Sequence, residues 1–183
     1  LLVATSCFGQ HRQSSGRLFQ RMRQLRGLNY GDYAYIEHFP GGMFALERSP
    51  NLARRRQIFE VWIRPVERGH AHFSLRLALF ELQRLIAGGL TEEEFRRTRS
   101  FLSKYVGIVL RTTSFRLGYE IDSHFYGIPS FPAYLREGLE RLTLDDVNRA
   151  IRKHLRAGRL RIAMVGPEME EMRNALINNA ASP

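Results

Sequence analysis

Two side chains near the start of the chain have polar tips that could converge on one ligand. Arg23 lies in a short basic stretch, and Tyr30 follows a glycine turn seven residues later. Arginine carries a permanent charge on a planar group, which suits it to clamp a carbonyl or a carboxylate. A tyrosine hydroxyl can donate a hydrogen bond to the oxygen that becomes negative during amide hydrolysis. The alternative is that Arg23 is a solvated helix arginine and Tyr30 a half-buried strand tyrosine. If the site lies close by but not at this pair, Arg26 and Tyr33 are the fallback candidates.

A short helix is predicted to carry the arginine. Leu18, Met22 and Leu25 recur at helical spacing and give residues 16–26 one apolar face. Gly27 stands where the end of a helix often needs a left-handed residue. The arginines lie mostly off the apolar face, so their polar tips can converge on a ligand.

A strand follows and is predicted to carry the tyrosine. Residues 30–38 alternate and include three tyrosines, a pattern typical of a strand. Tyr33 and Tyr35 are an odd number of residues from Tyr30, so on a regular strand they share the face opposite to it. The helix and the strand thus form a corner that carries Arg23 and Tyr30.

This corner resembles a known family of peptidases. The run Ser15-Gly16-Arg17-Leu18-Phe19, followed by Arg23 and by Gly27-Leu28-Asn29-Tyr30, is similar to the second half of the pitrilysin/insulinase (inverzincin) zinc metallopeptidases. It also resembles mitochondrial processing peptidase and the bacterial two-subunit peptidases. In that family one domain binds zinc through an inverted H-x-x-E-H motif, and a homologous C-terminal domain lacks the metal. The resemblance implies that Arg23 and Tyr30 match the arginine–tyrosine pair that the non-zinc domain offers to the substrate.

Motifs in the second half of the chain continue the resemblance in the same order. The run Gly89-Leu90-Thr91-Glu92-Glu93-Glu94-Phe95 is similar to the family's entry to a long helix, and Tyr126-Gly127-Ile128-Pro129 to its (Tyr/Phe)-Gly-x-Pro turn. Residues 142–147 and Val165-Gly166-Pro167 are like its closing helix and strand. These matches extend from residue 9 to residue 167. The strand that precedes the opening helix in the family is missing here, so either the sheet lacks one strand or the chain was cut.

The predicted elements define the fold class. Strands grouped first and helices grouped afterwards predict an α+β two-layer sandwich, with a mostly antiparallel sheet and helices packed on one face. Strands are expected at residues 30–38, 58–66 and 160–165, with a weaker candidate at 43–46. Besides a helical turn or two at residues 1–8, helices are expected at 16–26, between Gly69 and Gly88, and at 91–109, 112–126, 130–142, 143–155 and 168–179.

The metal-ligating residue types do not form a zinc site in this sequence. A catalytic zinc needs three protein ligands and an open position. None of the six histidines belongs to H-x-x-E-H, and the closest pair, His70 and His72, is expected to be solvated at a helix start. The single cysteine, Cys7, excludes a Cys-cluster site and is interpreted as a small buried residue. We therefore expect no metal and no cofactor in this chain, and the resemblance puts the zinc in a partner domain or subunit.

Composition bounds the class of protein. The chain has 183 residues, of which 44% are hydrophobic and 25% charged, and this predicts one domain over residues 1–183. The net charge is +10, but the arginines are spread along the chain, which argues against a dedicated nucleic-acid binder. No apolar run approaches the length of a membrane span. The opening reads like the middle of a helix, so the chain is interpreted as a fragment or a processed chain, and its compartment is unknown.

Three hypotheses of function remain. In the first, the chain is the substrate-binding half of a zinc endopeptidase, which clamps an extended peptide and helps to stabilise the scissile carbonyl. A homologous partner then supplies the zinc and the general base. Extended substrates of this family are also thought to add to a sheet edge, for which residues 43–46 are the candidate. In the second hypothesis the chain is a catalytically inactive homologue that serves as a structural or assembly subunit. The third is a basic nucleic-acid-binding module.

Overall fold

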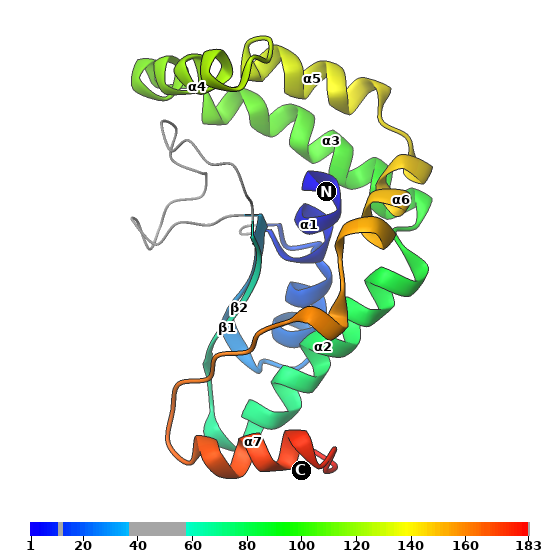
Figure 1. Ribbon diagram of the computed structural model, residues 1–183, viewed down its shortest axis with the longest axis vertical. Coiled ribbons are helices and arrows are strands. Elements are labelled where there is room, and N and C mark those ends of the chain that lie inside the picture. Colours follow the sequence, from blue (N-terminus) through cyan, green and yellow to red (C-terminus); the bar gives the residue numbers. More distant parts are fainter. Residues whose placement is uncertain (11–12, 37–57, 183) are drawn as a thin grey trace.

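The computed structural model describes residues 1–10, 13–36 and 58–182 (Figure 1). Within these ranges a two-stranded sheet lies beside a larger set of helices, which confirms the predicted α+β class. The elements in chain order are α1 (Leu2–Gly9), η1 (Phe19–Gln24), β1 (Asn29–Ile36), β2 (Phe59–Val66), η2 (Arg68–His70), α2 (Ala71–Gly88), α3 (Glu92–Val109), α4 (Thr113–Tyr126), α5 (Phe131–Arg141), α6 (Leu144–His154), η3 (Ala157–Arg159) and α7 (Met169–Ile177).

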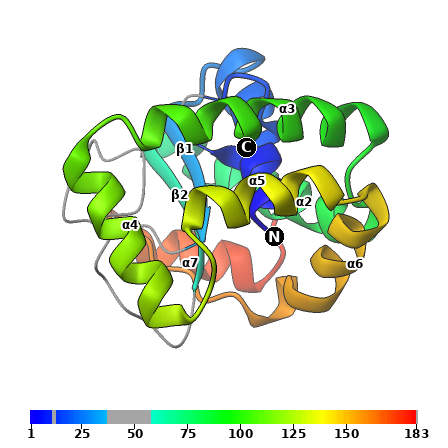
Figure 2. The same ribbon diagram turned by 90° about the horizontal axis from the view of Figure 1, so that it is seen from above.

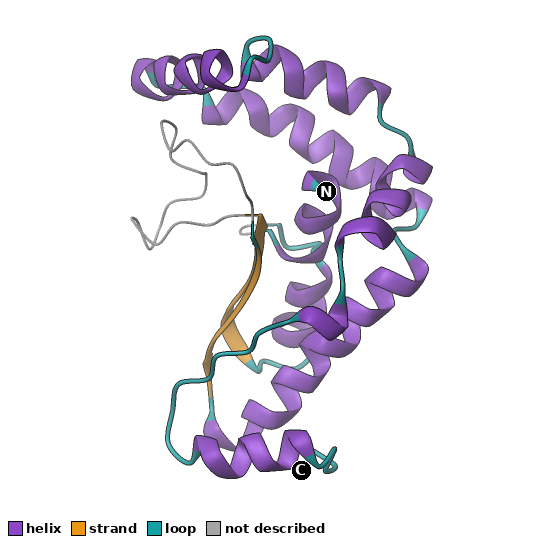
Figure 3. Cartoon of the chain, viewed as in Figure 1, coloured by secondary structure: helices purple, strands orange, loops and turns teal. Residues whose placement is uncertain are grey.

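The two strands β1 and β2 form an antiparallel pair. Tyr33 is opposite Trp62 across this pair, and Gly31 is opposite Arg64. Helix α1 contacts β1 and helix α2 contacts β2, and both lie on the same side of the strands (Figure 3). The view from above shows α5 beside α3, with which it is in contact (Figure 2). None of the helices in the described part of the chain is long and apolar enough to cross a membrane.

Helix α1 forms the centre of the core. Its residues 3–9 are all buried, and it contacts β1, α3 and α6. The helix closely approaches its neighbours at Gly9, where a Cβ would lie 2.8 Å from Leu18 Cδ1 and 3.1 Å from the backbone nitrogen of Ala34. Only glycine fits there without displacing its neighbours. The expected helical turns at residues 1–8 are confirmed.

Cys7 lies on this central helix and is 1% exposed. Burial raises the pKa of its thiol to about 11, and the nearby charge of Glu94 adds to the shift. A thiol that stays protonated is a weak nucleophile and a poor metal ligand. The interpretation of Cys7 as a small buried residue is confirmed.

The helices of the second half form where their sequence signals place them. Thr91 and Glu94 make a capping box at the start of α3, and Thr143 and Asp146 make another at the start of α6. Helix α4 ends just before Gly127, which has a left-handed φ of 64°. The buried apolar residues of these helices are Ala78, Leu82 and Leu85 on α2, Phe95, Leu102 and Val106 on α3, Tyr119 on α4, Leu139 on α5, and Val147 and Ile151 on α6.

The strand predicted at residues 160–165 is wrong. This segment is irregular, with Ile162 half exposed and Val165 fully exposed. Its apolar residues suit a strand, but a strand also needs a neighbour that accepts and donates main-chain hydrogen bonds. No backbone hydrogen bond of this segment occurs within residues 1–10, 13–36 and 58–182. The candidate strand at residues 43–46 lies outside the described residues.

An ion pair between Arg17 and Glu94 connects the start of the chain to the helical half. Arg17 Nε and Nη2 donate to the two carboxylate oxygens of Glu94 at 2.8 and 2.7 Å, and Nη2 also donates to the carbonyl oxygen of Gly89 at 2.7 Å. The two side chains are only 16% and 19% exposed. Asn148 of α6 holds the same junction, because its Oδ1 accepts from the backbone nitrogen of Leu90 at 2.8 Å. The loop between α2 and α3 is thereby fixed from two sides.

Breaking this ion pair is expected to destabilise the domain. Burial alone would raise the pKa of Glu94, but hydrogen bonds from Arg17 and Thr91 outweigh it and hold the pKa below its ordinary value. Arg17→Gln and Glu94→Gln should each lower the free energy of unfolding by about 2 kcal/mol, since each leaves a partly buried charge without its partner. Urea denaturation of both single variants and of the double variant measures this. The double variant should lose less than the two single losses combined, and additive losses would contradict the prediction.

Candidate functional site

The structure brings Arg23 and Tyr30 together at the corner between η1 and β1. The guanidinium carbon of Arg23 lies 4.3 Å from the centre of the Tyr30 ring and 5.2 Å from the centre of the Phe19 ring. Its Nη1 donates to the carbonyl oxygen of Tyr30 at 3.4 Å. Tyr30 is 69% exposed. The stacked pair is therefore accessible to a ligand from solvent.

The backbone of η1 is wound as a π-helix, whereas the residue spacing predicts an ordinary helix. Its hydrogen bonds span five residues, and one of them joins Leu25 N to Gln20 O at 3.1 Å. Each turn holds more residues than an α-helical turn, so the side chain that ends the turn rotates away from the apolar face. Leu18 and Met22 are fully buried as predicted, but Leu25 is 62% exposed. The prediction that Leu25 shares their face is wrong.

Gly27 ends this turn and directs the chain into β1. Its φ is 62°, in the left-handed region that favours glycine, as predicted. The backbone nitrogen of Gly27 donates to the carbonyl oxygen of Arg23 at 2.9 Å, and that of Leu28 donates to Met22 at 3.0 Å. The corner that sets Arg23 beside the first residues of β1 is thus a hydrogen-bonded unit.

A buried glutamate on α2 contacts the same turn. Glu81 is 2% exposed, and its Oε1 lies 3.1 Å from Nε of Arg21. Its Oε2 lies 3.7 Å from Nη1 of Arg84. The sequence patterns did not single out Glu81, although its position carries a signal. Glu81 shares the inward side of α2 with Ala78 and Leu82. A glutamate in such an apolar stripe needs a charged partner.

A second acidic residue adjoins the pair. Asp32 is 5% exposed, and its Oδ2 has no hydrogen-bond partner among the described residues. Burial raises the pKa of this carboxyl to about 6, and the charge of Arg23 opposes the shift. Asp32 lies two residues after Tyr30, so both belong to the same side of β1. A charged residue at an inward strand position is the sequence signal that marks it.

The fallback residues have other neighbours. Arg26 Nη1 donates to the carbonyl oxygen of Arg21 at 2.8 Å, and its guanidinium carbon lies 5.9 Å from the centre of the Phe73 ring. The ring of Tyr33 lies 5.9 Å from that of Tyr35. Burial raises the pKa of Tyr33, and a neighbouring carboxylate adds to the shift. Arg23 and Tyr30, the first-choice pair, are in direct contact with each other.

The two histidines predicted to be solvated differ from each other. His70 is exposed, but His72 is 9% exposed and its Nδ1 lies 3.0 Å from Oγ of Ser182. The prediction is therefore wrong for His72, because the last described residues pack over the start of α2. The same packing includes Arg76 Nη1, which donates to the carbonyl oxygen of Ala180 at 2.7 Å.

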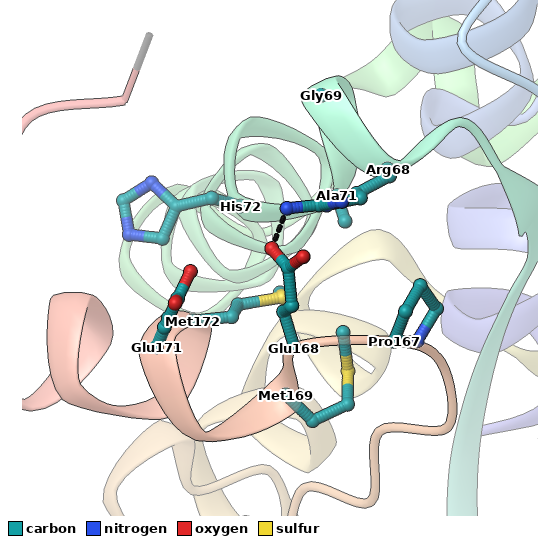
Figure 4. Close-up of a pocket in the computed structure, with 9 residues that line it drawn as sticks. All are labelled: Arg68, Gly69, Ala71, His72, Pro167, Glu168, Met169, Glu171 and Met172. Atoms are coloured by element: carbon teal, nitrogen blue, oxygen red, sulfur yellow. Dashed lines mark ion pairs between the residues drawn. The ribbon is translucent and has the colours of Figure 1, made fainter.

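His72 lines a hollow of about 260 Å³ between the starts of α2 and α7 (Figure 4). Arg68 and Glu168 form an ion pair there. Met169 and Met172 also line the hollow, and the His72 ring is turned away from their sulfur atoms (Figure 4). In the part of the chain that the structure describes, no three His, Cys, Asp or Glu side chains gather in a way that could hold a metal ion.

Comparison with known proteins places the fold. The chain is similar to a crystal structure of the peptidase M16 inactive domain from Pseudomonas fluorescens, with a TM-score of 0.64 and 19% sequence identity. The similarity covers 85% of this chain and 34% of that one, so the chain spans about a third of its length. No protein-family model and no curated protein sequence matches the chain. At this level of identity the likeness shows a shared fold.

Asp32 is expected to make the stability of the domain depend on pH. Its pKa is about 6 in the folded protein, above the ordinary value of 3.8, so the folded state favours the protonated acid. This contribution to stability therefore grows as the pH falls from about 7 toward about 4 and is lost again as the pH rises. In Asp32→Asn the unfolding free energy should change less over this range, as measured by urea denaturation at several pH values. Equal slopes in the two proteins would contradict the prediction.

Proposed function

We propose that this chain is the zinc-free, substrate-binding half of a zinc-dependent endopeptidase of the pitrilysin/insulinase (M16) family. A homologous domain or subunit supplies the zinc and the general base, and an extended peptide binds between the two. The observation that carries the proposal is the Arg23 guanidinium stacked 4.3 Å from the centre of the exposed Tyr30 ring. The similarity of the fold to an M16 inactive domain supports the choice of family.

The contacts of the pair suit it to bind a peptide main chain. Within the described part of the chain, Arg23 contacts the rings of Phe19 and Tyr30 and one carbonyl oxygen. A guanidinium that rests on an aromatic face keeps N–H groups at the edge of its plane, where they can donate to a carbonyl or a carboxylate of the peptide. The Tyr30 hydroxyl donates to the scissile carbonyl oxygen as negative charge develops on it. The pair thus orients the peptide and stabilises the reacting group.

A second candidate function is that of an assembly subunit without a role in turnover. Three apolar residues spaced four apart on α4 are largely exposed, namely Leu117 at 60%, Ile121 at 50% and Phe125 at 58%. An apolar stripe of this kind on a surface helix is typical of a face that another protein covers. The nucleic-acid hypothesis has only the net charge of +10 in its favour.

Replacing the pair in the complete enzyme separates the two functions. Tyr30→Phe should lower the turnover of an extended peptide about 10²-fold, because it removes a hydrogen bond made to the reacting oxygen. Arg23→Gln should lower turnover as well, chiefly through weaker peptide binding. Tyr33→Phe and Arg26→Gln are the matched controls, since each removes the same group from a neighbouring position. If turnover falls only in the two control variants, Tyr33 and Arg26 are the residues that bind the peptide. Unchanged turnover in all four variants would favour the assembly function.

The chain alone is expected to hydrolyse no peptide, because the metal and the general base belong to its partner. The assay follows cleavage of fluorescein-labelled casein by the chain with added zinc, by the partner domain with added zinc, and by the two together. Activity should require the partner and should disappear with a chelator. Chelator-sensitive hydrolysis by the chain alone would refute the proposed division of roles.

A further inference from the structure

We infer that Glu81 is a positioning residue for Arg23 and acts through the π-helical turn η1. The inference rests on the proposed function, since the orientation of Arg23 matters to a peptide only if Arg23 binds one. Glu81 itself is 2% exposed and belongs to α2. Its influence on a ligand must therefore pass through the residues that it contacts.

The first step of this connection is an ion pair. Glu81 Oε1 lies 3.1 Å from Nε of Arg21, and the second arginine near it, Arg84, is more distant at 3.7 Å. A buried carboxylate is costly unless it is paired and hydrogen-bonded. Glu81 is fixed on a helix whose residues Leu82 and Leu85 are in the core. The ion pair therefore ties the turn that carries Arg21 to a rigid element.

The second step is the winding of the turn. Arg21 and Arg23 flank Met22, which is fully buried, so both arginines leave the core from adjacent positions. A π-helical turn rotates less per residue than an α-helical turn, and this brings Arg23 round toward the side of Met22. Isolated π-helices are rare and need contacts that favour them. The Glu81–Arg21 ion pair and the burial of Met22 are two such contacts.

The third step is the stacking of Arg23 itself. Its guanidinium carbon lies 4.3 Å from the centre of the Tyr30 ring, well inside the range of about 6 Å over which a cation and a ring attract each other. A turn that relaxed to α-helical winding would rotate Arg23 away from this ring while leaving its charge in place. Losing Glu81 should therefore weaken peptide binding without removing any group that touches the peptide.

A double-mutant cycle on peptide affinity tests this inference in the complete enzyme. Zinc is removed with a chelator to prevent cleavage, and the binding of fluorescein-labelled casein is followed by anisotropy. Glu81→Gln should weaken binding about tenfold in the wild-type background and have almost no effect in the Arg23→Gln background. Glu94→Gln breaks the other ion pair of the opening stretch and serves as the control, with the same effect on binding in both backgrounds.

The outcomes separate the inference from the function on which it rests. If Glu81→Gln weakens peptide binding equally in both backgrounds, Glu81 has only a structural role and the inference is overturned. The proposed function would still stand in that case, provided that Arg23→Gln itself weakens peptide binding. If the Arg23→Gln single variant binds the peptide as tightly as the wild type, both the proposed function and the inference are overturned. Arg21→Gln provides a second route if Glu81→Gln fails to fold, because Arg21 is 40% exposed and can be replaced without opening the core. Its effect should also vanish in the Arg23→Gln background, and an effect that persists there would overturn the inference.

Discussion

The two-pronged ion pair between Arg17 and Glu94 is the contact on which the arrangement of this domain depends. It joins positions 77 residues apart in the chain. The same carboxylate also caps α3, because its Oε2 accepts from the backbone nitrogen of Thr91 at 2.9 Å. One side chain thus fixes the start of a long helix and the start of the chain relative to each other. The two short motifs around Arg17 and Glu94 are therefore the two halves of one structural unit.

The arginines of the opening stretch divide into two kinds by their partners. Arg17 and Arg21 lie against carboxylates of α3 and α2, and so attach the stretch to the helical layer. Arg23 and Arg26 lie over aromatic rings instead. The first kind attaches the stretch to the helices, and the second kind presents its charge over a ring. A basic stretch that reads as uniform in sequence therefore combines anchoring residues with residues oriented for contact.

Local signals predicted what depends on a few adjacent residues. The capping boxes at Thr91 and Thr143 and the left-handed turn at Gly27 need only their own neighbours, and all three are present. Predictions that depended on distant partners were less successful. The segment at 160–165 has a strand-like composition, but it can form a strand only if another strand lies beside it to pair with it. His72 has a helix-start signal, but the end of the chain covers it.

The candidate site shows the same division. The spacing of Arg23 and Tyr30 follows from a helix, a glycine and a strand in succession, so their meeting could be predicted. One contact of the π-helical turn is to Glu81, 60 residues away in sequence, and no periodicity within the turn contains that information. The exposure of Leu25 follows from the winding and could not be predicted from spacing alone. Asp32 carries a sequence signal, a charged residue at an inward strand position, but its burial is a property of the fold.

The burial of Cys7 makes the chain a natural background for site-specific labelling. A thiol whose pKa is about 11 is ionised in only about one molecule in 10⁴ at neutral pH, and maleimides react with the ionised form. Cys7 is also the single cysteine among residues 1–183. A cysteine introduced on the surface would therefore take up a fluorophore or a spin label essentially alone. The approach of this domain to another protein can then be measured as a distance, without first removing a native residue from the core.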